Sequence, residues 1–177
     1  MSEKGFELCS NFSFLTTDTN MTPSTSATEM GDLNSEYNFD TQNNRATVPW
    51  PGGTYIIRDP KSNRQITLVD GHISMEPHLG DQGGYHWHCI SKDGWLGFRN
   101  PSDGLHLGHD NKGNIVANQR HHLGWESFVT RGYPDGGQMI YTRHDNIKLR
   151  VISNLEGYKL GYHSDEKNGI VWEFIKV

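Results

Sequence analysis

The chain has 177 residues, of which 33% are apolar and 20 are glycine, and its formal net charge is −5. This length allows one domain with a tail, and the glycine content favours a turn-rich β-protein over a helical one. The sequence contains no apolar run long enough to cross a membrane and no basic nucleic-acid-binding motif, so neither kind of partner is expected.

Residues 1–48 differ in composition from the remainder of the chain. Positions 1–47 carry seven acidic and two basic residues, whereas positions 48–177 carry fourteen of each. Residues 16–44 are rich in Ser, Thr and Asn, a composition that buries too little surface to offset the entropy of ordering. We therefore predict an acidic, low-complexity arm over residues 1–48 and one folded domain over 49–177. Docking of the arm as a strand or short helix is the alternative, because its start contains Phe6, Leu8, Phe12, Phe14 and Leu15.

The N-terminal residues predict a cytoplasmic protein. They lack the continuous apolar stretch and small-residue cleavage site of a secretory signal. In a reducing compartment Cys9 and Cys89 are expected to be free thiols, and the sequons at Asn11 and Asn20 are expected to stay unmodified.

Residues 51–177 contain three copies of one pattern. Each copy opens on an apolar stretch and closes on a tryptophan 32, 30 or 33 residues later; the pairs are Tyr55 and Trp87, Trp95 and Trp125, and Met139 and Trp172. Two further short apolar segments lie within each copy, separated by turn residues such as Gly, Asn and Asp. The second segments are Ile66/Leu68, Leu105/Leu107 and Leu149/Val151, and the third are Ile73, Ile115 and Tyr158/Leu160.

Three copies of four short strands, without helical periodicity between them, predict a closed all-β domain. Twelve strands about a pseudo-threefold axis would form a β-trefoil, and closure removes the edge strands that an open sheet must protect. An antiparallel sandwich is the alternative. In the trefoil interpretation Trp87, Trp125 and Trp172 form the core. Trp50, which precedes the first copy, is expected to plug one end of the closed sheet.

Part of the second copy resembles a repeat of the fascin-like and hisactophilin-like β-trefoils. The resemblance rests on Leu105-His106-Leu107-Gly108-His109-Asp110, on residues 113–117 and on Trp125 and Phe128, while residues 171–177 are similar to the last strand of that group. It covers about residues 50–177 and implies the fold. It leaves function open, because related trefoils bind actin or sugars, inhibit proteases or act as signalling ligands.

Charge and motif content narrow the partners that the resemblance implies. Actin is the first partner that the resemblance implies, but an uncharged domain with an acidic arm is disfavoured as a partner of acidic filaments. A lectin role is weakened because the Gln-x-Trp repeat of ricin-like trefoils is absent. Protease inhibition stays open, since it needs only exposed loops.

Two groups of histidines are candidates for chemistry. In His86-Trp87-His88 both imidazoles should face outward on a strand, and without a third ligand they are predicted to be solvated, so no metal or cofactor is expected. His106 should also face outward. In His109-Asp110 the carboxylate could orient the imidazole as a general base, with His88 as a further acid–base candidate and Arg99 or Arg120 holding an anionic oxygen. The alternative is that Asp110 caps its turn.

Loops that break the repeat are the preferred ligand site, since binding residues gather on loops of a rigid fold. Residues 75–85 and 131–137 are such loops, with Tyr85 and Tyr133 as aromatic anchors. The predicted binding residues are Trp50, Tyr85, His86, Trp95, His106, Arg120, His122 and Tyr133. The leading hypothesis is a binding protein for a small molecule, glycan or protein. The alternative is a cofactor-independent cyclase, isomerase or hydrolase, which requires an apolar cavity walled by Trp50, Tyr85, Trp95 and Tyr133.

Overall fold

The computed structural model describes residues 47–80, 84–144 and 148–177. The predictions for residues 1–46, including Cys9, the two sequons and the docking of the arm, lie outside these ranges, and the boundary at residue 48 stays a prediction. Thr47, the first described residue, donates from Oγ1 to the carbonyl of Phe174 at 2.6 Å. Within the described ranges, no helix has the length and apolar character needed to cross a membrane.

Twelve strands in the described residues fall into three sets of four. The first set is β1 (Thr54–Asp59), β2 (Arg64–Val69), β3 (His72–Glu76) and β4 (His86–Lys92). The second is β5 (Trp95–Arg99), β6 (His106–His109), β7 (Ile115–Gln119) and β8 (Phe128–Gly132). The third is β9 (Gln138–His144), β10 (Lys148–Asn154), β11 (Leu160–His163) and β12 (Val171–Lys176), with the 3-10 helix η1 (Glu166–Asn168) before its last strand. Each set matches one predicted repeat.

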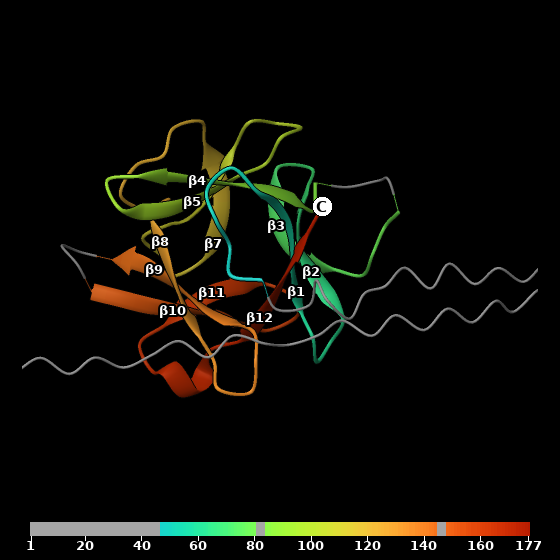
Figure 1. Cartoon of the computed structure of the whole chain (residues 1–177), viewed down its shortest axis with the longest axis vertical. Helices are drawn as coiled ribbons and strands as arrows, with labels where there is room; N and C mark the ends of the chain where they lie inside the picture. The colour runs from blue at the N-terminus through green and yellow to red at the C-terminus, as the bar shows by residue number, and fades with distance from the viewer. Residues whose placement is uncertain (1–46, 81–83, 145–147) are drawn as a thin grey trace, which may run out of the picture. The chain divides into compact units, whose positions relative to one another are not determined.

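Six of the strands form a closed antiparallel ring. Going round it, β1 pairs with β4, β4 with β5, β5 with β8, β8 with β9, and β9 with β12. Strand β12 returns to β1, and Figure 1 shows these first and last strands side by side. The hairpins β2–β3, β6–β7 and β10–β11 continue from β1, β5 and β9 respectively. The predicted β-trefoil is confirmed, and the sandwich alternative is wrong.

Asp-Gly pairs make two of the hairpins tight. Between β4 and β5, Lys92 faces Trp95 across Asp93-Gly94, whose φ angles are 52° and 81°. Between β2 and β3 the pair Asp70-Gly71 has φ angles of 49° and 77°. Two consecutive positive φ angles match the right-handed twist of the flanking strands, which is why Asp-Gly is favoured in two-residue hairpins.

The core contains two of the three closing tryptophans. Trp87 and Trp172 are fully buried, as predicted, but Trp125 is 49% exposed and the prediction for it is wrong. Strand β8 begins only at Phe128, so Trp125 lies in the connection before the strand and Phe128 takes the buried place. The Phe98 ring packs against Phe128 and Phe174 with both centroid separations at 5.7 Å, so three different strands fill the centre.

Trp50 does not plug the closed sheet. Its side chain is 74% exposed. Its amide donates to the Tyr55 hydroxyl at 2.9 Å, which fixes the backbone beside β1 and leaves the indole outside. The expectation for Trp50 is wrong because the aromatic rings of the sheet already fill the interior.

Candidate functional site

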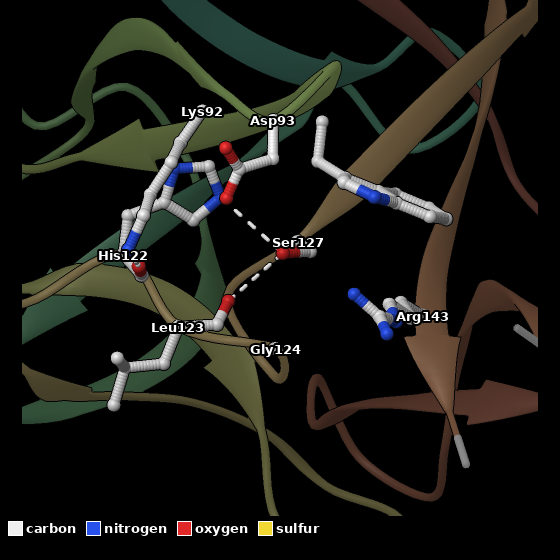
Figure 2. A pocket seen from close by; sticks show the side chains of 8 residues that line it. Lys92, Asp93, His122, Leu123, Gly124, Ser127 and Arg143 are labelled. Atoms are coloured by element: carbon white, nitrogen blue, oxygen red, sulfur yellow. Dashed lines mark hydrogen bonds between the residues drawn. The ribbon is translucent and has the colours of Figure 1, made fainter. Parts of the chain in front are cut away.

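A hollow of about 200 Å³ opens between the β4–β5 hairpin, the connection over residues 120–127 and strand β9 (Figure 2). We call it the Trp95 pocket. Its lining combines charged, hydroxyl, imidazole and aromatic groups and consists of Lys92, Asp93, Trp95, His122, Leu123, Gly124, Ser127 and Arg143. The pocket therefore lies where the second repeat meets the first and the third.

The β4–β5 hairpin positions one wall of the Trp95 pocket. Because the Asp93-Gly94 turn is only two residues long, Lys92 and Trp95 are direct cross-strand partners at the rim. The Lys92 Nζ donates to the carbonyl of His122 at 3.0 Å. This hydrogen bond ties the hairpin to the connection over residues 120–127, so two walls of the pocket hold a fixed separation.

Strand β9 supplies the opposite wall through Arg143. Its amide donates to the carbonyl of Ser127 at 2.9 Å. Its guanidinium carbon lies 5.3 Å from the centroid of the half-buried Trp95 ring, within the range of a cation–π contact. Among the described residues this guanidinium has no hydrogen-bond or carboxylate partner, so its N–H groups are available to a bound molecule.

Ser127 and His122 lie at the floor of the Trp95 pocket, and Figure 2 marks their contact. The Ser127 hydroxyl donates to the carbonyl of Leu123 at 2.8 Å, and its oxygen is 3.4 Å from His122 Nε2. The hydroxyl therefore has a closer acceptor in the Leu123 carbonyl than in His122 Nε2. The arrangement is therefore not that of a serine nucleophile whose proton is taken by histidine.

The surroundings of His122 favour its neutral form. Burial lowers its pKa, and the neighbouring His106 and Lys92 lower it further, against a smaller opposite effect of Asp93. Among the described residues its Nδ1 has no hydrogen-bond partner. A β-carbon added at Gly97 would lie 2.9 Å from this Nδ1, so a glycine is needed for the ring to lie against β5.

His106 stacks on His122, with ring centroids 6.2 Å apart. The expectation that His106 faces outward is wrong, since it is only 4% exposed. The pairing of β6 with β7 shifts register between His106 and Leu107, so both side chains turn inward. Burial also lowers the pKa of His106.

Two buried residues, Glu126 and His109, lie behind the pocket beside the connection over residues 120–127. Glu126 is 2% exposed, and its Oε2 accepts from the amide of Leu123 at 3.2 Å. Burial raises the pKa of Glu126, an effect that hydrogen bonding and the nearby His109 reduce. His109 is also buried, with Nε2 2.7 Å from the Arg143 carbonyl and Nδ1 3.0 Å from the Asp110 carbonyl.

Asp110 caps its turn, which was the structural alternative to a catalytic role. Its carboxylate accepts from the amides of Lys112 and Asn114 at 2.8 and 2.9 Å. Its backbone carbonyl, and not its carboxylate, meets the His109 ring. The two residues are therefore close, but the carboxylate does not orient the imidazole.

The remaining histidines and arginines of the prediction lie away from the Trp95 pocket. His88 contacts the Thr54 hydroxyl with Nδ1 at 3.2 Å, and the His86 ring packs at a tilt of 53° against the Tyr85 ring. Within the ranges that the structure covers, no group of three or more His, Cys, Asp or Glu residues is arranged to hold a metal. Arg120 donates to the carbonyl of Asp103 at 2.9 Å, and Arg99 is exposed on β5 opposite His88 and His106.

The predicted aromatic cavity is not formed. Tyr85 is buried between His78 and His86, and its hydroxyl donates to the carbonyl of Gly80. Tyr133 is 45% exposed and lines a different hollow of about 650 Å³ beside η1. Trp95 is thus the one aromatic residue of the expected four that lines the Trp95 pocket.

Of the predicted binding residues, the structure brings Trp95 and His122 to one pocket. It adds Ser127, Arg143 and the hairpin residues Lys92 and Asp93, which sequence reasoning missed. The Asp-Gly turn could have identified Lys92, because a two-residue hairpin makes the flanking Lys92 and Trp95 cross-strand partners. No comparable local signal links Arg143 to Trp95, since 47 intervening residues separate them.

Comparison with solved structures identifies the fold. A designed threefold-symmetric protein, ThreeFoil, superposes with a TM-score of 0.59 at 14% identity, covering 71% of this chain and 99% of its own. A ricin B-like lectin from Macrolepiota procera, in complex with lactose, gives a TM-score of 0.58 at 16% identity, covering 74% of this chain and 100% of its own. The chain is a β-trefoil.

A longer enzyme contains a similar part. The GlcNAcα1-4Gal-releasing endo-β-galactosidase from Clostridium perfringens gives a TM-score of 0.61 at 15% identity over 71% of this chain. The match spans only 32% of that enzyme. No protein-family model matches the chain. The search of curated proteins also found no match. At these identities the similarity establishes the fold alone.

Proposed function

We propose that this protein is a carbohydrate-binding β-trefoil and that the Trp95 pocket is its sugar site. The observation that carries the proposal is a half-buried tryptophan beside a guanidinium that has no hydrogen-bond or carboxylate partner among the described residues, both in one small hollow. A sugar ring has C–H groups on one face and hydroxyls around its edge. It therefore needs an aromatic surface beside several hydrogen-bonding groups, and the Trp95 pocket offers both.

The size and polarity of the pocket favour one sugar ring over an apolar small molecule. Its volume is about 200 Å³, below the roughly 300–1,000 Å³ of pockets that enclose drug-sized ligands. Arg143 offers N–H donors, and Asp93 offers carboxylate acceptors at the rim. A ligand with many hydroxyls can satisfy donors and acceptors together, whereas an apolar ligand would leave them unpaired.

The solved relatives are consistent with this ligand class. The Macrolepiota procera lectin, which shares the fold over 74% of this chain, is in complex with lactose. This chain lacks the Gln-x-Trp repeat of ricin-like lectins, so its sugar site is proposed from its own residues. The fascin-like assignment and the cytoplasmic location remain predictions.

The enzymatic alternative has less support. The Ser127–His122 contact is the arrangement in the pocket that most resembles a hydrolase, but the Ser127 hydroxyl donates its proton to a backbone carbonyl. That carbonyl lies 2.8 Å from the hydroxyl oxygen, whereas His122 Nε2, the candidate base, lies 3.4 Å from it. Recovery of the bound sugar by mass spectrometry tests this alternative: an unchanged sugar supports binding, and a cleaved or isomerised sugar supports an enzyme.

Binding of the full-length protein to a printed array of mono- to hexasaccharides tests the proposal. We expect the wild type to retain a subset of glycans and Trp95→Ala to lose them, because the ring forms the apolar wall of the pocket. Tyr133→Ala is the matched control, since it removes an exposed aromatic ring outside the pocket. An array without any bound glycan, or equal binding by Trp95→Ala and wild type, would overturn the proposal.

A further inference from the structure

A second hollow lies against the Trp95 pocket. Its volume is about 400 Å³, and its lining is Gln119, Leu123, Gly124, Trp125 and Glu126. Leu123 and Gly124 line both hollows. Two residues of extended chain span roughly 7 Å at most, so the two hollows lie close enough for one oligosaccharide to reach both. We call the second one the Trp125 hollow.

The Trp125 ring is exposed and yet held in place. Its indole stacks on His109 with centroids 5.3 Å apart and an angle of 26° between the planes. The His109 ring is buried and lies within hydrogen-bond distance of two backbone carbonyls. The His109 amide also donates to the Trp125 carbonyl at 3.3 Å. One face of the indole is therefore covered by a fixed partner, and the ring is preorganised for a ligand on its other face.

The exposure of Trp125 departs from the threefold pattern. The closing tryptophans of the first and third repeats are fully buried, whereas Phe128 fills that place in the second. Trp125 is thus not needed for the core, and it lies beside Leu123, which is 52% exposed. Two adjacent exposed apolar side chains next to a polar pocket mark a binding surface better than a single exposed residue does.

We propose that the Trp125 hollow is a second subsite, which takes the next sugar unit of an oligosaccharide whose first unit occupies the Trp95 pocket. This inference rests on the proposed function. The Trp125 indole supplies a second aromatic wall, and the exposed Gln119 amide supplies a donor and an acceptor for hydroxyls at the ring edge. The shared Leu123-Gly124 wall would lie between the two sugar rings of one bound oligosaccharide.

The subsite predicts that chain length increases affinity. On an array that places each monosaccharide beside oligosaccharides ending in it, the wild type should bind the oligosaccharides about tenfold more tightly, as expected for one further aromatic contact. Trp125→Ala should reduce oligosaccharide binding to the monosaccharide level and leave monosaccharide binding unchanged. Trp125→Tyr should restore part of the difference, because it keeps an aromatic ring at the same position.

The outcomes separate this inference from the proposed function. If Trp95→Ala removes all binding and Trp125→Ala changes nothing, the Trp95 pocket stands and the second subsite is refuted. If the wild type binds no glycan, both are refuted. A change in oligomeric state with Trp125→Ala, measured by light scattering and without loss of glycan affinity, would assign the hollow to a contact between copies and would also refute the subsite. Urea midpoints of each variant control for folding.

Discussion

The indole nitrogens of Trp87 and Trp172 provide a matched test of hydrogen bonding in the core. Both side chains are fully buried on equivalent strands. Trp87 Nε1 donates to the Ile66 carbonyl at 2.9 Å, whereas Trp172 Nε1 has no hydrogen-bond partner among the described residues. We therefore expect Trp87→Phe to cost more stability than Trp172→Phe, although both remove the same atoms.

The difference follows from the structure. Each substitution leaves a similar cavity, at a cost of about 1 kcal/mol, which cancels between the two variants. In Trp87→Phe the Ile66 carbonyl loses its donor, because the opposite amide of Met75 donates to Tyr158. An unpaired buried group costs about 1–3 kcal/mol. Trp172→Phe instead removes such a group, so the two free energies of unfolding should differ by about 2 kcal/mol or more.

Urea unfolding followed by circular dichroism measures this difference. With a slope of about 1–3 kcal/mol per molar urea, the midpoint of Trp87→Phe should lie about 1 M below that of Trp172→Phe, and the slopes should be equal. Equal midpoints would refute the reasoning, because they would mean that the Trp172 indole is hydrogen-bonded as well as the Trp87 indole is.

Three further predictions concern buried groups. Phe128→Ala should cost about 3–5 kcal/mol and Trp125→Ala clearly less, because only Phe128 lies in the core; a thermal midpoint for Trp125→Ala below that of Phe128→Ala would contradict the observed register. Burial raises the pKa of Glu126 above its ordinary value of 4.5, so the folded state holds this proton more tightly, and its contribution to stability falls as pH rises through the folded pKa. Glu126→Gln should then stabilise the protein at neutral pH but not below the ordinary pKa, and urea midpoints over a pH series that show the opposite trend would exclude this. Burial raises the pKa of Cys89 to about 12, so iodoacetamide at pH 8 should label it only after unfolding; modification of the Cys89 peptide in the native protein, read separately from that of Cys9 by mass spectrometry, would show an accessible thiolate.

The strand order was predictable because local patterns repeat. Short apolar segments recur at similar spacing in each copy, and Asp93-Gly94 and Asp70-Gly71 mark turns without reference to any distant contact. Closure of the ring then follows from the number of strands and their repeat. These features depend on residues that are near one another in sequence, which is the range over which a single sequence is informative.

The errors occurred where spacing does not determine register. Trp125 and Phe128 are both aromatic and three residues apart, and only the start of β8 decides which one enters the core. His106 turns inward because a local shift of pairing with β7 places it and Leu107 on the buried side. Strict alternation cannot anticipate such a shift.

The candidate site was only partly predictable for a related reason. Trp95 and His122 were identified as binding residues, but their partners Ser127 and Arg143 come from other elements that closure of the sheet brings together. The preference for the Tyr133 loop assumed that irregular loops carry the ligand. The Trp95 pocket lies instead where a tight hairpin meets strand β9.

The central claim is that a sugar binds at Trp95, and the side-chain indole signals of the protein test it most directly. The chain has five tryptophans, whose indole N–H groups give separate signals in a ¹H–¹⁵N spectrum. Titration with the best-bound oligosaccharide of the array should move the Trp95 and Trp125 signals and leave those of the buried Trp87 and Trp172 in place. Movement of the Trp50 signal alone, with Trp95 unchanged, would contradict the account.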